Sequence, residues 1–498
     1  MRKKRLLFNI VFALSLQIIT ILCGFILPRI MLTTYGSEVN GLVTSIAQFL
    51  HVISFLELGI GAVVQSALYK PLAEKNNEVI SRVLSSASKF FRTIGLILFA
   101  YVCVLTVVYP YVSHQEFGFV YTATLILAIS ISSFFQYYFG IVDGLLLNAD
   151  QRGYIVSVAG IVTVVTTTAV CCIEMKAGAT IHIVKLSASL IYLLRPAILR
   201  LYVNRHYSVS RRVKYDTEPI KQKWNGIAQH VSSVVLDQTD TIVLTLLATL
   251  SDVSIYSVYF LVVFGIKNLF FSVANGGVQS LLGELWAKKE SENVRSVFSA
   301  MEWSIHTVVT YIYTCTAVLI VPFVMVYTRG VTDANYDQPL FAAALVMANA
   351  VHCLRLPYHI MIKAAGRYKE TQSNYFISAL INIVVSIIGV KLLGLVGVAV
   401  GTLVSMLFQT IWMAHYNSKE LIKGSFLSFV KQMIINAVSV LLCVLVTRGI
   451  GLNSYTYPDW ILMAVKVALI NLALFALINV VFCRDKAKTL YTLLKRKK

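Results

Sequence analysis

Long apolar runs separated by short polar segments organise the whole chain. An α-helix needs about 20 apolar residues to cross a hydrocarbon core about 30 Å thick, and most runs reach or exceed that length. The pattern predicts an all-α polytopic membrane protein with fourteen transmembrane helices. The predicted spans are 6-34, 37-69, 80-112, 118-147, 153-174, 179-203, 224-249, 253-285, 295-327, 338-364, 370-391, 395-416, 427-448 and 459-483.

Composition supports this interpretation and excludes a soluble multidomain protein. Hydrophobic residues make up 57% of the 498 residues and charged residues only 13%. The net charge of +20 is spread over loops beside predicted helices, which favours a rim facing anionic lipids over a nucleic-acid surface. The eight cysteines show no CxxC spacing, so we expect free thiols and no metal site.

Positive charge alternates between the gaps and thereby predicts the topology. Of the 43 Lys and Arg residues, 33 lie at the two termini and in or beside every second gap, whereas only Lys176, Arg329, Lys391 and Arg448 lie in or beside the other gaps. Short cytoplasmic loops retain Lys and Arg. Both termini are therefore predicted to be cytoplasmic.

A weak internal repeat divides the predicted helices into two lobes. Gln65 and Ser66 recur as Gln279 and Ser280, an offset of 214 residues, and similar matches follow in the same order. Parallel repeats of this kind relate two lobes with a substrate pathway between them. The predicted domains are an N-lobe of six helices at 1-204, a basic linker at 205-223, a C-lobe of six helices at 224-417, and two C-terminal helices with a basic tail at 418-498.

Six cations break the pattern because they lie inside apolar spans. A central charge costs about 2.5–3.5 kcal/mol on insertion scales, so it needs a partner, water or a functional reason. Five of the six are candidates for binding an anionic group in a hydrated cavity: Arg29, Lys185, Arg195, Lys267 and Arg355. For Arg29 and Lys185 the alternative is snorkelling to the membrane surface, which is also our interpretation of the sixth, Lys466.

Embedded acids and glycines suggest how such a cavity would operate. Glu57, Asp237 and Asp240 are candidates for coupling to an ion, with structural pairing to a Lys or Arg as the alternative reading of the two aspartates. Glycines interrupt two long predicted helices at matching positions, either as hinges of a moving region or as sites of close helix packing. The hinge candidates are Gly59, Gly61, Gly276 and Gly277.

Several motifs, together with the span count, resemble the Wzx-type polysaccharide flippases. The motifs are Leu27-Pro28-Arg29, Tyr35-Gly36 through Asn40-Gly41, Leu56-Glu57-Leu58-Gly59-Ile60-Gly61, Tyr69-Lys70-Pro71-Leu72 and Asp240-Thr-Ile-Val. This family belongs to the multidrug/oligosaccharidyl-lipid/polysaccharide exporter (MOP) superfamily. The resemblance covers the chain in topology, while its sharp motifs lie mainly within residues 27-72.

The resemblance implies a bacterial plasma-membrane flippase that moves an undecaprenyl-pyrophosphate-linked oligosaccharide to the outer leaflet by alternating access. It further implies an ion gradient as the driving force, an apolar groove formed by helices thirteen and fourteen, and polysaccharide polymerase or assembly proteins as partners beside membrane lipids. No catalytic residue, cofactor or nucleic acid is expected. Absence of a GxxxxGK[ST] sequence argues against direct use of ATP.

Three alternatives belong to other classes of protein. A multidrug antiporter of the same superfamily would share the lobes but favours twelve spans and an acidic cavity. A membrane enzyme would need a larger polar loop than the segments near 328-338 and 447-459 provide. A non-transporting scaffold of polysaccharide assembly would use its embedded charges as structural pairs.

Overall fold

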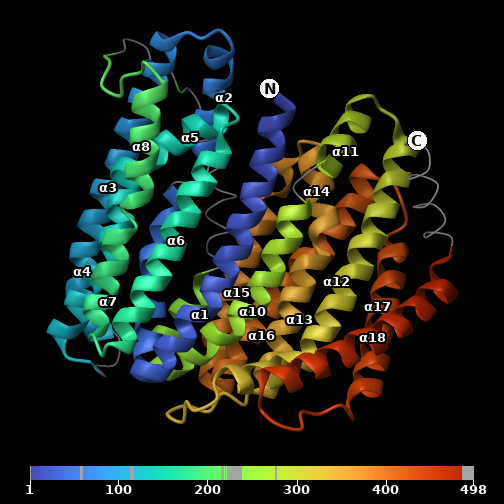
Figure 1. The fold of residues 1–498 in the computed structure, drawn as a ribbon. Coiled ribbons are helices and arrows are strands. Elements are labelled where there is room, and N and C mark those ends of the chain that lie inside the picture. The colour runs from blue at the N-terminus through green and yellow to red at the C-terminus, as the bar shows by residue number, and fades with distance from the viewer. Residues whose placement is uncertain are drawn as a thin grey trace. The chain divides into compact units, whose positions relative to one another are not determined.

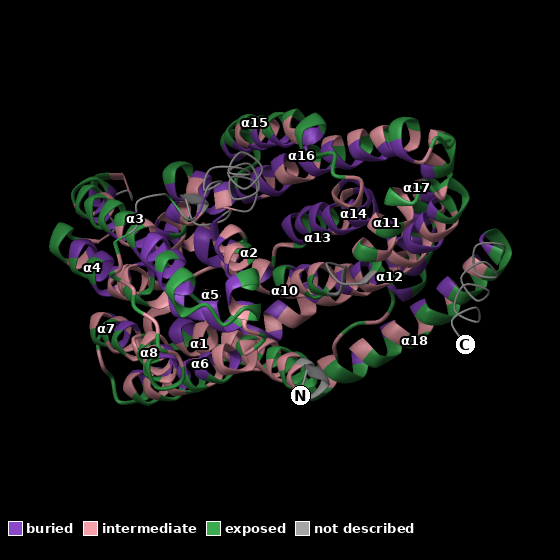
Figure 2. Ribbon diagram, turned by 90° about the horizontal axis from the view of Figure 1, so that it is seen from above, coloured by how far each residue is buried: buried purple, intermediate pink, exposed green. Residues whose placement is uncertain are grey.

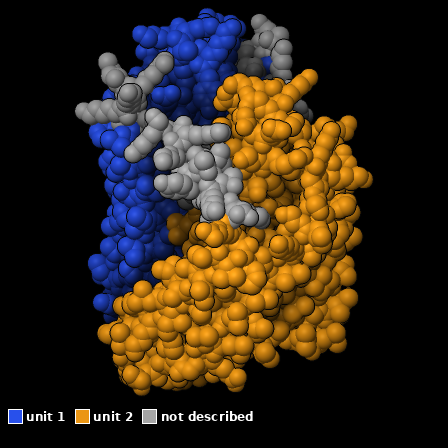
Figure 3. All heavy atoms as spheres, turned by 90° about the vertical axis from the view of Figure 1, so that its right-hand side faces the viewer, with its two compact units in different colours: residues 1–254 blue, residues 255–498 orange. Residues whose placement is uncertain are grey.

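The computed structural model is helical in every regular element of the residues that it describes (Figure 1). These residues are 2–56, 60–112, 117–214, 218, 220, 238–274 and 277–484. The predicted all-α class is confirmed. Contacts divide the chain into two compact units, Met1–Ser254 (unit 1) and Ile255–Lys498 (unit 2), shown in Figure 3.

Unit 1 contains the helices up to the first turn of α10. Its elements are α1 (Arg2–His51), the 3₁₀ turn η1 (Val52–Leu56), α2 (Ile60–Ala73), α3 (Asn77–Val112), α4 (Phe119–Phe135), the π-turn η2 (Gln136–Gly140), α5 (Ile141–Ala149), α6 (Gly153–Lys176), α7 (Ile181–Ile191) and α8 (Leu194–His206). Residues 238–247 are also helical.

Unit 2 contains the rest of α10 and all later elements. They are α10 (Leu250–Ala274), α11 (Gly277–Ala287), α12 (Ser291–Tyr327), α13 (Pro339–Leu354), α14 (Leu356–Ala364), α15 (Tyr368–Leu393), α16 (Leu395–Tyr416), the π-turn η3 (Asn417–Leu421), α17 (Phe426–Thr447) and α18 (Tyr457–Phe482).

Twelve stretches of the described residues are long and apolar enough to cross a membrane. They agree with the fourteen predicted spans apart from two. The first of the twelve, Leu7–Ser54, holds the first predicted span and much of the second, and the predicted span 224-249 lies largely outside the described residues.

Gly36 separates the first two predicted spans. The helix α1 bends there because Gly36 has φ of 84°, a left-handed value that side chains disfavour. Five residues later, Gly41 meets the first turn of α10 so closely that a Cβ would overlap the Leu250 carbonyl. Beside it, Asn40 Nδ2 donates to Ser254 Oγ at 2.7 Å. The motif residues Gly36, Asn40 and Gly41 therefore shape one helix bend and one helix contact in unit 1.

The buried face of the appended helix α17 is mostly polar, and the exposed face of the next helix, α18, is mostly apolar. On α17 the buried residues include Gln432, Asn436, Ser439 and Thr447. Figure 2 shows exposed segments along α18. Its exposed residues include large apolar side chains along its length: Ile461, Leu462, Val465, Leu469, Leu472 and Leu477. This inverted pattern is expected where the surrounding solvent is lipid, since apolar side chains then gain nothing by turning inward.

Helices α15 and α16 approach each other at their shared hairpin end through small residues. A Cβ on Gly389 would lie 2.6 Å from the Gly397 carbonyl oxygen, and a Cβ on Gly401 would lie 2.7 Å from the Ser386 nitrogen. Close backbone approach at small residues is a main source of helix association in membranes. Here the contact fixes one end of the α15–α16 pair. Two polar sites described below lie on the same two helices.

Gly397→Ala is expected to destabilise this helix pair, because the new methyl group must push the α15 backbone away. Overpacking of this kind costs about 1–3 kcal/mol. The apparent Tm of the purified protein in detergent should fall. A matched control is Gly265→Ala on α10, where a Cβ meets nothing within 4 Å. Equal Tm values for the two variants would contradict the proposed packing role.

Candidate functional site

In unit 1 the three predicted cations occupy different surroundings. Arg29 lies half-buried in the proline-containing part of α1, and Lys185 lies half-buried on α7. Arg195 lines a cavity of about 170 Å³ together with Ser132, Gln136 and Tyr192. Neither Arg29 nor Lys185 contributes to that cavity, so these cations do not form one cluster there.

The Arg195 cavity forms where α4 gives way to the π-turn η2. Such turns are rare and are frequent at functional sites. Gly140 at the end of η2 leaves room for α8, since a Cβ there would lie 3.2 Å from Pro196. The amide groups of Gln136 and Asn148 face the same cavity as Arg195. This combination provides one cation with neutral hydrogen-bonding groups.

The coupling and hinge candidates are described only in part. Glu57, Gly59, Asp237 and Gly276 lie outside the described residues. Asp240 is buried in the helical segment 238–247. Of the remaining glycines, Gly61 on α2 would place a Cβ 3.4 Å from Leu145 of α5, and Gly277 begins α11.

Arg355 lies in unit 2 at the break between α13 and α14. Pro357 in the first turn of α14 cannot donate a backbone hydrogen bond, so it favours a helix boundary at this point. The guanidinium is 95% buried, since only 5% of Arg355 is exposed. It donates to Gln409 Oε1 of α16 and lies 2.8 Å from His352 Nε2.

Other helices complete the surroundings of Arg355. Its guanidinium lies 5.9 Å from the ring centre of Tyr375 on α15, and the Tyr375 hydroxyl lies 2.6 Å from His359 Nδ1. Lys267 of α10 is also buried and interacts electrostatically with His352. The Lys267 ammonium lies 5.1 Å from the ring centre of Phe264. We call Lys267, His352, Arg355 and His359 the cationic cluster.

Within the cationic cluster, the described residues that contact Arg355 are neutral. Among the residues that the structure describes, no carboxylate forms an ion pair with Arg355, and its Nε has no hydrogen-bond partner. Removing an unpaired ion from water is unfavourable by several kcal/mol even after relaxation. A buried guanidinium in this condition is suited to binding an anion, with two donor edges for phosphate or carboxylate.

A polar seam of neutral side chains lies on α15, the helix that carries Tyr375, and the sequence analysis missed it. Along α15 every fourth residue is polar and fully buried: Asn374, Ser378, Asn382 and Ser386. Of these, Asn374, Ser378 and Ser386 form no side-chain hydrogen bond with any described residue. Buried polar groups of this kind normally bind water or a polar ligand. The four-residue spacing is visible in the sequence, but a search for charges passes over it.

At one end of unit 1, residues 207–214 form a linker strap that lies against the helices. Backbone amides of the strap donate to serines on α3, from Ser210 to Ser81 Oγ at 3.0 Å and from Val213 to Ser85 Oγ at 2.8 Å. Arg211 pairs with the buried Asp143 of α5 at 2.6 Å. The basic segment between the predicted lobes thus has a specific binding site on unit 1.

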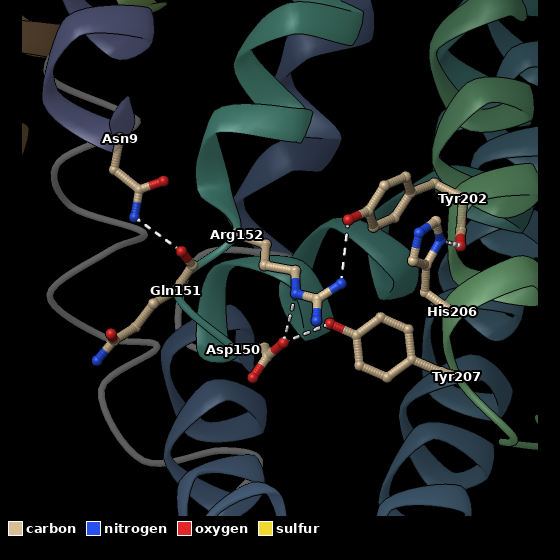
Figure 4. A network of polar contacts seen from close by, with 7 residues as sticks. All are labelled: Asn9, Asp150, Gln151, Arg152, Tyr202, His206 and Tyr207. Atoms are coloured by element: carbon tan, nitrogen blue, oxygen red, sulfur yellow. Dashed lines mark hydrogen bonds and ion pairs between the residues drawn. The ribbon is translucent and has the colours of Figure 1, made fainter. Parts of the chain in front are cut away.

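A second network, drawn in Figure 4, holds the start of the strap. Tyr207 donates to Asp150 Oδ2 at 2.6 Å, and Asp150 also pairs with Arg152 at 2.9 Å. Arg152 donates to the Tyr202 hydroxyl at 3.0 Å, while Asn9 of α1 donates to the Gln151 carbonyl at 3.1 Å. Burial, and then the bond to Asp150, raise the pKa of Tyr207, so its hydroxyl remains a proton donor at neutral pH.

Comparisons with solved structures identify the fold. A structure of the lipid II flippase MurJ in an inward closed conformation matches with a TM-score of 0.70 and 14% identity, covering 96% of this chain and 99% of that chain. An inward-facing multidrug resistance MATE family transporter of the MOP superfamily matches with a TM-score of 0.62 and 14% identity, covering 82% of this chain and 98% of that chain.

The chain has the fold of these MurJ and MATE structures. It is a multi-pass membrane protein. An outward-facing MATE structure matches less closely, with a TM-score of 0.51, 13% identity and coverage of 81% of this chain. No family model and no curated protein matches the sequence. At these identities the similarity to MOP structures shows the fold alone.

Asp143→Asn should release the linker strap, because the neutral amide leaves Arg211 buried without its carboxylate. Breaking a buried ion pair costs about 3–5 kcal/mol. Trypsin should then cleave after Arg211 or Arg212 at least tenfold faster in the detergent-purified protein. Glu78→Gln, which removes the exposed pair with Arg82, is the control and should not accelerate cleavage. Unchanged cleavage of the Asp143 variant would contradict this role.

Proposed function

We propose that this protein is a flippase that moves an undecaprenyl-pyrophosphate-linked oligosaccharide across a bacterial plasma membrane by alternating access. One observation carries the proposal: Arg355 is buried and is held by neutral groups within the described part of the chain. A pyrophosphate supplies the missing negative charge. The polyprenyl chain stays in hydrocarbon, where it needs no polar contact.

The charge of the cluster separates this proposal from a multidrug antiporter. Cationic drugs require acidic groups, whereas Lys267 and Arg355 place positive charge beside His352. Electrostatic repulsion between like charges in a poorly hydrated site disfavours a cationic ligand. The anionic head group of a lipid-linked glycan meets the same charges with attraction.

The two appended helices give independent support. The MurJ structure matches 96% of this chain, whereas the MATE structure matches 82%. Helices α17 and α18 extend from residue 426 to residue 482, so they correspond to the last two of the fourteen predicted spans. We assign them to the groove for the lipid tail, since their outer faces expose large apolar side chains.

The other predicted site residues take secondary roles in the proposal. Arg29, Lys185 and Arg195 would attract the head group as it enters or leaves, while amides such as Gln409 bind sugar hydroxyls. The glycines at 59, 61, 276 and 277 would permit bending during the transport cycle. Coupling to an ion gradient is assigned to Glu57, Asp237 and Asp240, and polymerase or assembly proteins are the expected partners.

Lys267→Ala and Arg355→Gln are expected to reduce export of the glycan by about 10- to 100-fold, because hydrogen bonds to charged groups contribute about 1.5–3 kcal/mol each. The measurement is complementation of a deletion strain, with quantification of exported glycan and of lipid-linked intermediates that accumulate inside. The accumulated species would also identify the substrate.

Matched variants separate charge from folding in this experiment. Lys466→Ala removes an exposed cation from the apolar helix α18 and should leave export intact. Arg355→Lys keeps the charge and should restore part of the activity. Normal export by both Lys267→Ala and Arg355→Gln, at equal membrane abundance, would refute the assignment of the cavity.

Asp240→Asn should remove the dependence of transport on an imposed ion gradient, because an amide neither binds nor releases a proton and holds cations weakly. Transport in proteoliposomes, measured with and without a gradient, gives the result. Asp252→Asn is the control, since Asp252 caps the start of α10 through Thr249. Retention of the gradient dependence in Asp240→Asn would exclude the coupling role.

A non-transporting scaffold remains the alternative from another class of protein. It predicts that the purified protein has no transport activity in proteoliposomes, whereas variants of the cationic cluster impair assembly through lost stability. Reconstitution with labelled lipid-linked glycan distinguishes the two. Drug-accumulation assays distinguish the antiporter, since a glycan flippase confers no drug efflux.

A further inference from the structure

Unit 2 contains a polar cavity, separate from the cationic cluster, at the opposite end of α15 and α16 from their glycine contact. Its volume is about 370 Å³. Seven residues line it: Arg367, Glu370, Trp412, His415, Tyr416, Lys419 and Glu420. We call it the rim pocket. None of its residues belongs to the cationic cluster or the polar seam.

The wall of the rim pocket is built by the π-turn η3. Asn417 is buried and donates to the carbonyls of Met413 and Tyr358, at 2.8 and 3.2 Å, which fixes the turn against α14. Arg295 of α12 donates to the carbonyls of Ile422 and Lys423 just beyond the turn. The wider turn thereby presents Lys419 and Glu420 toward the pocket from a braced backbone.

The lining carries both signs of charge beside an aromatic stack. Arg367 pairs with Glu370 at 2.7 Å, and the rings of Trp412 and Tyr416 stack at 5.3 Å with an angle of 4°. Within the described part of unit 2, Lys419 and Glu420 form no ion pair and the Trp412 indole N–H has no acceptor. Donors for a phosphate and an acceptor for an ammonium therefore lie in one pocket.

The location indicates a lipid as the source of this ligand. The pocket lies where two candidate membrane spans, Tyr368–Leu393 and Leu395–Leu421, approach their polar ends. Large apolar side chains are exposed along the same helices, at helical spacing: Phe376 and Leu380 on α15, Leu407 and Ile411 on α16. Trp and Tyr are characteristic of the membrane interface, where one part of the ring is apolar and another is hydrated. Acyl chains can follow these faces while the head group enters the pocket.

We propose that the rim pocket binds the zwitterionic head group of a phosphatidylethanolamine-type phospholipid. Lys419, Arg367 and the Trp412 N–H bind the phosphate, and Glu420 together with Glu370 binds the primary ammonium. Phosphatidylglycerol, an anionic lipid, lacks the ammonium and leaves the two carboxylates facing a phosphate of the same sign. The near-balance of charges in the lining therefore selects a zwitterion.

Native mass spectrometry of the full chain tests the proposal. The protein is extracted from vesicles that contain equal amounts of phosphatidylethanolamine, phosphatidylcholine and phosphatidylglycerol, and the retained lipids are counted. The double variant Lys419→Gln with Glu420→Gln removes one charge of each sign and keeps the net charge. We expect preferential retention of phosphatidylethanolamine by the wild type and about fivefold weaker retention by the double variant, equal to ~1 kcal/mol.

The control variant is Lys288→Gln with Glu284→Gln, which removes an exposed pair of the same composition on α11. It should retain phosphatidylethanolamine as the wild type does. Preference for phosphatidylglycerol in the wild type, or equal retention by the two double variants, would overturn the proposal. Displacement of the lipid by millimolar soluble phosphoethanolamine would assign the pocket to a free metabolite and would also overturn it.

Discussion

The burial of one guanidinium with no negative partner among the described residues is the constraint on which the proposed site depends. Arg355 is removed from water at a helix break, and residues on α13, α15 and α16 supply the neutral contacts that hold it. Each contact compensates part of the lost hydration, but none supplies a counter-charge. The described residues around Arg355 therefore leave its positive charge uncompensated, and a bound anion neutralises it. Lys267, which is buried nearby, adds positive charge to the same region.

Much of the architecture could be predicted because membrane insertion depends on length and polarity. Span ends such as 295-327 and 338-364 lie within a few residues of α12 and of the α13–α14 pair. The predicted break in the chain between residues 34 and 37 coincides with the bend at Gly36. Candidate charges were equally visible, since a Lys or Arg in an apolar run is conspicuous. Arg355 and Lys267 were found in this way and do lie in one buried cluster.

Contacts between distant segments could not be predicted from one sequence. The polar seam on α15 consists of Asn and Ser. The free-energy cost of placing these residues in an apolar run is small, so they do not stand out in the sequence. The strap of residues 207–214 is basic, and its charges alone suggested the membrane surface as its location. Its actual partners are serines of α3 and the carboxylate of Asp143, which the tertiary fold brings to it. Specific pairing of this kind depends on geometry that periodicity does not encode.

The exposed apolar faces have a consequence for how this protein changes over evolutionary time. A position that faces hydrocarbon accepts Leu, Ile, Val or Phe with little difference in free energy, because the lipid is fluid and fits any of these shapes. The close contacts at Gly41 and Gly397, by contrast, leave no room for a Cβ. Most lipid-facing residues can therefore be substituted while the helices keep their positions. The fold match at 14% identity and a TM-score of 0.70 is consistent with this tolerance.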